Sequence, residues 1–300
     1  ISGFLSLEEH EKCLPPESPN VAVLFDNASF SWDIEKTTTT TTTTDKGVAG
    51  KGAAPFKLDN IQLTVRTGHL VGIVGRVGCG KSTLLNSLLG EVQLTEGKVY
   101  ALSDIGYVPQ KPFVLSGTVL ENIMMGRDHD DLLLQNALRA SDFYQDLLTL
   151  SGGLETEIGE RGMTLSGGQK QRLAIARAVY SRPELLIVDD ALAAVDGKVA
   201  TRIFQAVCDE RKISKLTTII ALNQLSFLPK FDLIVFLVEG VIHDQGTYDE
   251  LLSRCELFKT MVSVTGGSGR RGVARCCHKQ SEDIGWCCWR RSAGSFQGPC

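Results

Sequence analysis

The 300-residue sequence lacks an apolar run long enough to cross a bilayer. The best candidate, LIVFLVEGVI at 233–242, contains Glu239 and is about half of the ~18–20 residues that a transmembrane helix needs. No basic segment followed by an apolar one opens the chain, so we expect no secretory signal. The sequence begins with Ile1 rather than Met, and we therefore expect a piece of a longer polypeptide.

The sequence also lacks the regular cysteine spacing of a disulfide-bonded protein. Five of the nine cysteines fall in the last 25 residues, and those in the body are scattered, which is typical of a reducing compartment. The tail motifs CCH (276–278) and WCCW (286–289) contain no C-x₂-C pair, so the pattern does not favour a zinc site.

The body of the chain has little excess positive charge with which to bind nucleic acid. Before residue 264 it has 25 Lys/Arg and 33 Asp/Glu, a net charge of −8, whereas the remainder carries +4. An acidic body argues against a nucleic-acid groove. With 43% hydrophobic residues, the chain can still bury a full core, as one large domain or two small ones.

Two segments lack any apolar periodicity. Residues 35–55 hold eight consecutive threonines and then a Gly/Ala-rich stretch, and residues 264–300 are rich in Cys, Arg and Gly. We expect both to be disordered.

Between these two segments, strand-like and helix-like patterns alternate. We expect strands at 61–66, 69–75, 98–102, 104–110, 185–190, 217–222 and 232–238, and helices at 81–90, 131–143, 169–181 and 199–207. Since the central strands are apolar on both faces, the pattern predicts an α/β fold around a largely parallel sheet.

GRVGCGKST follows an apolar strand, opens a helix, and fits the phosphate-binding pattern G-x-x-x-x-G-K-[ST]. Glycines let backbone N–H groups turn toward phosphate oxygens, and the helix start adds its positive dipole end. The lysine can reach the β- and γ-phosphates, and the serine hydroxyl can bind Mg²⁺. The alternative is a Gly-rich turn that happens to precede Lys-Ser. The candidate ATP-binding residues are Gly75, Arg76, Val77, Gly78, Cys79, Gly80, Lys81, Ser82 and Thr83.

LSGGQ is the second motif, made of Leu165, Ser166, Gly167, Gly168 and Gln169. Alone it describes an N-capped helix start. Together with the phosphate loop, it makes residues 21–263 resemble the nucleotide-binding domain of ABC transporters. The resemblance implies a P-loop NTPase core with a mainly parallel sheet, an antiparallel β-subdomain and a helical signature subdomain.

The same resemblance assigns roles to further residues and implies ATP and Mg²⁺ as ligands. Trp32 matches the aromatic that stacks on adenine, although an edge-strand aromatic packed on its neighbours remains an alternative. Gln110 matches the glutamine that contacts Mg²⁺ and the attacking water, and Asp189 matches the metal-associated aspartate. TEIGERG (156–162) is similar to the segment that meets the transmembrane domains, and AAVD (193–196) to the loop that crosses to the partner domain.

A finer resemblance is to the first nucleotide-binding domain of subfamily C, the multidrug-resistance-associated group. VGCGKST, GERGMTLSGGQKQRLAIARAVYS and VDDALAAVD carry it, and GFLSLEE (3–9) resembles the linker from a preceding membrane domain. We therefore expect a linker at 1–20, a domain at 21–263 on the cytoplasmic face of a membrane, and a tail at 264–300. The implied partners are transmembrane domains and a second nucleotide-binding domain, with the transported substrate bound by membrane helices outside this chain.

Two positions depart from the general ABC pattern. Asp190 stands where most members have a glutamate that polarises the attacking water, and general-base assistance contributes ~10²–10⁴ in rate. Asn223 stands where the family has a histidine on the γ-phosphate, and loss of one donor costs ~10²–10³, unless the amide compensates. First domains of subfamily C typically carry the aspartate. We expect slow hydrolysis at this half-site, while the intact LSGGQ completes the site of the partner domain.

Two other function classes stay open at this point. One is a soluble ABC ATPase without a transport role, which the acidic body and the TEIGERG and GFLSLEE segments disfavour. The other is a regulatory nucleotide sensor of a channel or receptor, since subfamily C includes sulfonylurea receptors and the cystic fibrosis conductance channel.

Overall fold

The computed structural model describes residues 13–32, 56–159 and 165–266, all within one compact unit, Ile1–Gly266. The predicted loop at 35–55, the lead-in at 3–9, residues 160–162 of TEIGERG and the tail beyond 266 lie outside the described residues. Within the described ranges, no helix combines the length and apolar character that crossing a bilayer requires.

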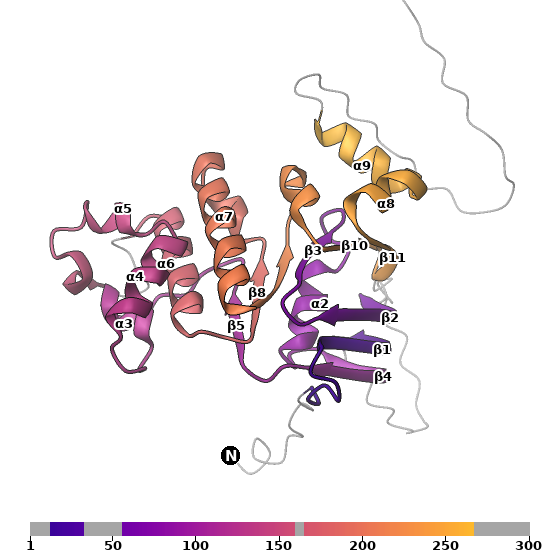
Figure 1. Ribbon diagram of the computed structural model, residues 1–300, viewed down its shortest axis with the longest axis horizontal. Helices are drawn as coiled ribbons and strands as arrows, with labels where there is room; N and C mark the ends of the chain where they lie inside the picture. The colour runs from indigo at the N-terminus through magenta and orange to yellow at the C-terminus, as the bar shows by residue number, and fades with distance from the viewer. Residues whose placement is uncertain (1–12, 33–55, 160–164, 267–300) are drawn as a thin grey trace, which may run out of the picture. The chain divides into compact units, whose positions relative to one another are not determined.

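A six-stranded sheet occupies the middle of this unit (Figure 1). In spatial order its strands are β11 (Val241–Gly246), β10 (Leu233–Val238), β3 (Leu70–Val74), β9 (Thr217–Ala221), β8 (Leu185–Asp189) and β5 (Ile105–Val108). All neighbours pair in parallel except β10 and β11. Every residue of β3, β8 and β9 is buried, as expected for parallel strands covered on both faces. The predicted fold class is confirmed.

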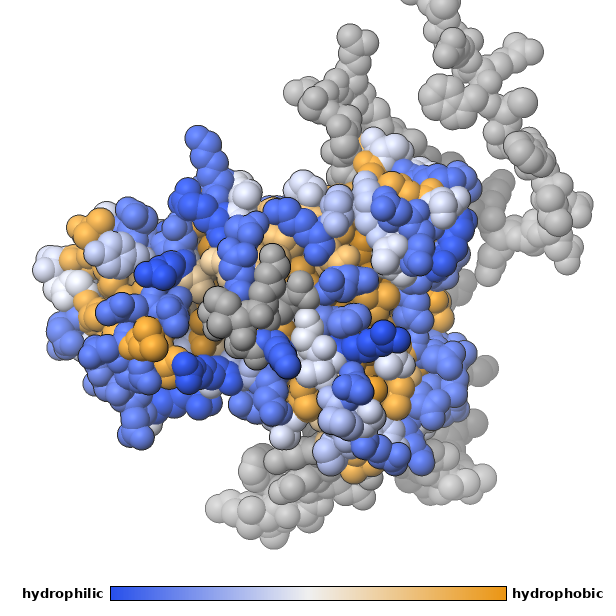
Figure 2. All heavy atoms as spheres, in the orientation of Figure 1, coloured by the Kyte–Doolittle hydropathy of each residue, from blue (hydrophilic) through white to orange (hydrophobic). Residues whose placement is uncertain are grey.

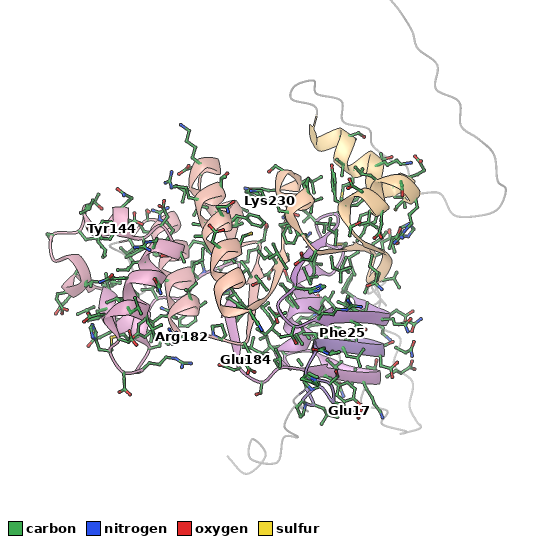
Figure 3. All side chains as sticks on the ribbon, in the orientation of Figure 1. Glu17, Phe25, Tyr144, Arg182, Glu184 and Lys230 are labelled. Atoms are coloured by element: carbon green, nitrogen blue, oxygen red, sulfur yellow. The ribbon has the colours of Figure 1, made fainter. Side chains whose placement is uncertain are left out.

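A second sheet is antiparallel, with β1 (Val21–Ser31) between β2 (Lys57–Arg66) and β4 (Gln93–Ala101). Phe25 and Phe30 of β1 meet edge to face at 6.0 Å, and Phe25, labelled in Figure 3, is fully buried. Helix α2 (Lys81–Leu88) contributes Leu84 and Leu85 to the same core. This sheet is the predicted antiparallel subdomain.

A helical region contains the LSGGQ helix α6 (Gly167–Tyr180), which packs on α3 (Val119–Met124) and α4 (Asp131–Ala140). Its other elements are β6 (Gly117–Thr118), α5 (Tyr144–Leu147), η1 (Gly153–Glu155) and β7 (Glu157–Ile158). On the face shown in Figure 2, the hydrophobic residues of this region are separated by hydrophilic ones.

Side chains of α6 bind four segments that lie 26 to 62 residues away in the sequence: the residues around Pro109, helix α3, the residues around Asp128, and α5. Gln171 Nε2 donates to the carbonyl of Pro109, and Arg177 Nε donates to that of Asn122. Arg172 forms a bidentate ion pair with Asp146 at 2.6 and 2.7 Å. The hydroxyl of Tyr180 donates to the carbonyl of Asp128. These bonds join α6 to the chain on both sides of Gln110.

The remaining helices lie beside the central sheet or come after its last strand in the sequence. Helix α7 (Gly197–Ser214) is capped by Asp196 and contributes Phe204, which stacks on Phe227 at 4.6 Å. The other elements are η3 (Ala191–Ala194), η4 (Leu225–Lys230), α8 (Tyr248–Arg254) and α9 (Glu256–Gly266).

Several boundaries differ from the sequence-based expectation. Strand β4 begins at Gln93 rather than 98, because the polar residues at its start pair with β1. Helix α7 runs to Ser214 rather than 207. Short elements such as α3, α5 and β11 were not predicted, because they are too brief or too mixed in polarity to show a period.

The β1–β4 pairing contains an irregularity at which Gly97 lies against the backbone of Asn27. Replacement of Gly97 by a larger residue should therefore destabilise the fold. Gly97 has φ +80°, and a Cβ there would lie 2.5 Å from the carbonyl oxygen of Asp26. Gly126 has φ +79° but open space around it. Gly126→Ala should cost about 1–2 kcal/mol through backbone strain alone. Gly97→Ala should cost at least ~1 kcal/mol more, because backbone atoms must move.

Urea unfolding of both variants measures this difference. Equal midpoints for Gly97→Ala and Gly126→Ala would show that the close approach at Gly97 has no energetic weight.

Candidate functional site

The parallel sheet brings several candidate residues to one edge. The register pairs Val108 with Val188 and Asp189 with Ala221, so the chain continues past this edge to Gln110, Asp190 and Asn223. Val74 of β3 precedes Gly75 at the same edge, because β3 is parallel to β9. In open α/β sheets, ligands bind outside the carboxyl ends of the strands. The candidate phosphate loop, acids and amides therefore meet at the expected place.

The phosphate loop between β3 and α2 is folded around close backbone approaches. A Cβ on Gly75 would clash with the carbonyl oxygen of Leu237 and lie 2.6 Å from Cys79 Sγ, so only glycine fits. Gly78 and Gly80 have φ of +83° and +107°, the left-handed region that glycine tolerates. Cys79 is buried, whereas Val77 is 90% exposed. The two glycines at Gly78 and Gly80 add no side chain to the loop, so the backbone there is open to a ligand.

The first turn of α2 has no side-chain cap and no acidic residue. Its N-cap is Gly80, and its first residues are Lys81, Ser82 and Thr83. Uncapped N–H groups at a helix start bind anions. Lys81 is 8% exposed, and its Nζ donates to the carbonyls of Gly75 at 3.0 Å and Arg76 at 3.3 Å. The ammonium group is therefore held inside the loop.

A hydroxyl and a carboxylate meet beside this loop. Ser82 Oγ donates to Asp189 Oδ1 at 3.0 Å, and Asp189 is 4% exposed. Burial raises the pKa of Asp189, and the charge of Asp190 adds to this, while the bond from Ser82 and the charge of Lys81 oppose it. Oxygen ligands of this kind suit Mg²⁺, which in proteins uses one or two carboxylates together with substrate phosphates. Within the described ranges, no group of three or more His, Cys, Asp or Glu side chains is placed so that it could hold a metal ion.

Asp190 and Asn223, predicted from separate motifs, are bonded to each other. Asn223 Nδ2 donates to Asp190 Oδ2 at 2.7 Å. Asp190 has φ +47°, in the left-handed region, and its N–H donates to the carbonyl of Ala221. The backbone of Asp190 is therefore bonded to the last residue of β9, and its side chain to the segment that follows β9.

Gln110 is exposed and follows Pro109, whose carbonyl accepts the bond from Gln171. Gln171 is fully buried, and its Oε1 has no hydrogen-bond partner among the described residues. The sequence reasoning missed Gln171, because a bond across 62 residues leaves no local pattern. It also missed Tyr107, whose pKa is raised to about 12 by burial and then by the charges of Asp189 and Glu91.

Trp32 and the LSGGQ motif lie on other elements. Trp32 follows the last residue of β1 and is 49% exposed. Ser166 caps α6 in a capping box with Gln169, and Leu165 is buried. Ser166 and Gly167 are exposed, and a Cβ on Gly168 would lie 3.7 Å from the carbonyl oxygen of Ala194. The signature therefore borders the AAVD loop of its own chain.

A groove of about 1050 Å³ lies at the other edge of the sheet. Arg182 and Glu184, labelled in Figure 3, line it and lie within the three residues before β8. No predicted site residue lines this groove, so it is separate from the phosphate loop.

The buried carboxylate of Asp189 predicts a stabilising substitution. Because its pKa is raised in the folded state, folding takes up protons between the unfolded and folded pKa values, and stability falls as pH rises through that window. Asp189→Asn removes the buried charge and keeps an acceptor for Ser82. Its melting temperature at pH 7 should exceed that of wild type by roughly 2–4 °C, and the gain should shrink as pH falls through the window.

Thermal unfolding at several pH values checks this prediction, with Glu157→Gln as the control for an exposed carboxylate. A difference between wild type and Asp189→Asn that does not change with pH would contradict it.

Comparison with known proteins extends these observations. Residues 58–193 match the ABC transporter family. ATP-binding cassette sub-family C member 3 from Homo sapiens is 37% identical over 262 residues, which is 85% of this chain and 16% of that protein. The rat protein of the same name is 38% identical over 84% of this chain, and the ABC-type transporter cicA of Emericella nidulans is 33% identical over 99%. The chain spans only 16–24% of the length of these relatives.

A solved structure of a bacterial Atm1-family ABC exporter with ATP bound superimposes with a TM-score of 0.75 at 27% identity. It covers 89% of this chain, and the chain covers 46% of it. Together, the phosphate loop, the two sheets, the helical region and these relatives show that the chain contains a nucleotide-binding domain of the ABC transporter family and resembles those of subfamily C.

Proposed function

We propose that this chain binds Mg-ATP and hydrolyses it slowly, as one of two nucleotide-binding domains of a subfamily C transporter. The observation that carries this proposal is the junction of Lys81, Ser82 and Asp189 at the carboxyl edge of the sheet. The loop between β3 and α2 supplies an ammonium group that can bind phosphate, an uncapped helix start and the hydroxyl of Ser82. The hydroxyl is bonded to the carboxylate of Asp189 at the end of β8, and these two oxygen groups can bind a cation.

In this proposal the phosphates lie against the first turn of α2. The N–H groups of the first turn, from Lys81 to Thr83, donate to phosphate oxygens, and the Lys81 ammonium exchanges its carbonyl partners for the β- and γ-phosphates. Trp32 stacks on the adenine. Ser82 and Asp189 would hold Mg²⁺, and the ion would neutralise charge on the phosphate oxygens.

The hydrolytic step depends on Asp190, Gln110 and Asn223. Asp190 accepts a proton from the water that attacks the γ-phosphate, and Gln110 orients that water. The bond from Asn223 occupies one oxygen of Asp190, and the side chain is one methylene shorter than glutamate. Asn223 cannot become cationic and so gives less stabilisation to the developing charge than a histidine would. Both features support a slow half-site.

The LSGGQ motif completes the ATP site of the partner domain, where hydrolysis is concentrated. Ser166 and Gly167 are exposed at the start of α6, so they are accessible to a second domain. The transmembrane domains, on the same longer chain or another, bind the transported substrate. This domain lies on the cytoplasmic face of the membrane and is the first of the two, since Asp190 is typical of first domains.

A nucleotide sensor is the second candidate, and the Asp190–Asn223 bond favours it. A site that retains ATP for long periods can stabilise a closed pair of domains without turnover. The two candidates differ in whether hydrolysis in the partner site drives vectorial transport.

The binding assignment predicts the effect of two substitutions. Lys81→Ala should weaken Mg-ATP binding by roughly 10–100-fold, because charge-assisted bonds to phosphate are lost. Trp32→Ala should weaken it by roughly 5–10-fold through lost stacking. Titration calorimetry on the 300-residue chain measures both, with Lys98→Ala as the control for an exposed lysine. Unchanged affinity in Lys81→Ala would refute the site.

The slow half-site predicts a coupled gain of function. Asp190→Glu or Asn223→His alone should raise ATP cleavage modestly, since each leaves the other defect in place. The double variant should exceed the product of the two single gains, because the side chains touch and act on one transition state.

The measurement is single-turnover ATP cleavage in the full transporter with its partner site disabled. Asp189→Asn should abolish the gain. Cleavage by wild type at the rate of the double variant would mean that Asp190 is already a competent base.

A further inference from the structure

Two aromatic residues occupy the ends of adjacent antiparallel strands. The last ladder pair of β1 and β2 is Ser31 with Lys57, so Trp32 and Phe56 hold the next positions outward. The preceding pair on the same face is Phe30 with Leu58, and both of these are buried in the core that includes α2. Because side chains alternate along a strand, Trp32 and Phe56 share the face that looks toward α2 and the phosphate loop.

Phe56 lies directly against that loop. A Cβ on Gly80 would be 2.7 Å from Phe56 Cζ and 3.0 Å from Leu58 Cδ2. A Cβ on Gly240 would lie 3.5 Å from the same phenyl atom, and Gly240 donates its N–H to the carbonyl of Cys79. The ring therefore rests on the glycine that precedes Lys81, and its packing is part of the glycine requirement there.

Both aromatic side chains remain partly open to solvent. Phe56 is 36% exposed and Trp32 49%. A phenyl ring has no hydrogen-bond donor for phosphate, so its free face suits the apolar and π surfaces of a nucleoside. Leu58, one position further in, is fully buried and cannot take this role.

We propose that Phe56 is a second base-selective residue of the nucleotide site, which together with Trp32 forms an aromatic wall against the purine and ribose of the bound triphosphate. This inference rests on the proposed function. Trp32 stacks on the base from the end of β1, and Phe56 contacts the nucleoside from the start of β2, next to the glycine where the phosphates begin. The aromatic wall selects a purine nucleoside, whereas the phosphate loop is indifferent to the base.

The experiment compares Mg-ATP with Mg-tripolyphosphate, which has the phosphates but no nucleoside, on the 300-residue chain. Phe56→Ala should weaken Mg-ATP binding roughly 5–30-fold, by loss of one stacking contact, and leave Mg-tripolyphosphate binding within about 2-fold. Phe56→Leu retains bulk against Gly80 without the π face and should lose nearly as much ATP affinity. Phe56→Trp should retain it. Tyr144→Ala, an exposed aromatic on α5, is the matched control.

A double variant tests whether the two aromatics act together. Trp32→Ala with Phe56→Ala should weaken Mg-ATP binding by less than the product of the single effects, because both residues contact one nucleoside. Melting temperatures of all variants verify folding.

Three outcomes would overturn the inference. A parallel loss of ATP and tripolyphosphate affinity in Phe56→Leu would mean that Phe56 only shapes the loop. Unchanged ATP affinity in Phe56→Ala would mean that the ring does not contact the nucleoside, and multiplicative losses in the double variant would separate the two aromatics. Failure of wild type to bind either ligand would instead refute the proposed function itself.

Discussion

The hydrogen bond from Ser82 to Asp189 joins the two halves on which the site depends. Ser82 lies in the first turn of α2, which follows β3, and Asp189 is the last residue of β8; β9 lies between these two strands in the sheet. A carboxylate that is 4% exposed is costly to bury, and its neighbours Ser82 and Lys81 offset part of that cost. The acid is thus stabilised by the same groups that the proposed nucleotide and cation would engage. Binding is then an exchange of partners rather than an addition of contacts.

Two helix starts in this fold are built in opposite ways. The N-cap residue of α2 is Gly80, which offers no side-chain cap. At the start of α6, the side chains of Ser166 and Gln169 each accept a hydrogen bond from the backbone N–H of the other. The first leaves backbone donors available beside a lysine, and the second satisfies two of its own groups at an exposed surface. This difference matches the proposed division of labour, in which α2 binds phosphate within the chain and α6 meets a ligand held by another domain.

The local sequence pattern predicted most of the central strands and the phosphate loop. It did not predict the contacts that join residues from different strands at the site. The apolar runs of β3, β8, β9 and β10 were long and pure enough to predict strands, and the glycine and lysine spacing located the phosphate loop. Asp190 and Asn223 were each identified as departures, yet their bond requires β9 to lie beside β8, which is a property of strand order. The place of Phe56 likewise follows from the register of β1 and β2, since Ser31 faces Lys57 across 25 residues of intervening chain.

The four segments bound by α6 have a consequence for how this region folds and opens. Its bonds to Pro109, Asn122, Asp128 and Asp146 span 62, 55, 52 and 26 residues of sequence. None of them can form until α6 has docked, and each is lost when it leaves. We therefore expect the helical region to open as one cooperative unit, whose amide hydrogens exchange with solvent together rather than segment by segment.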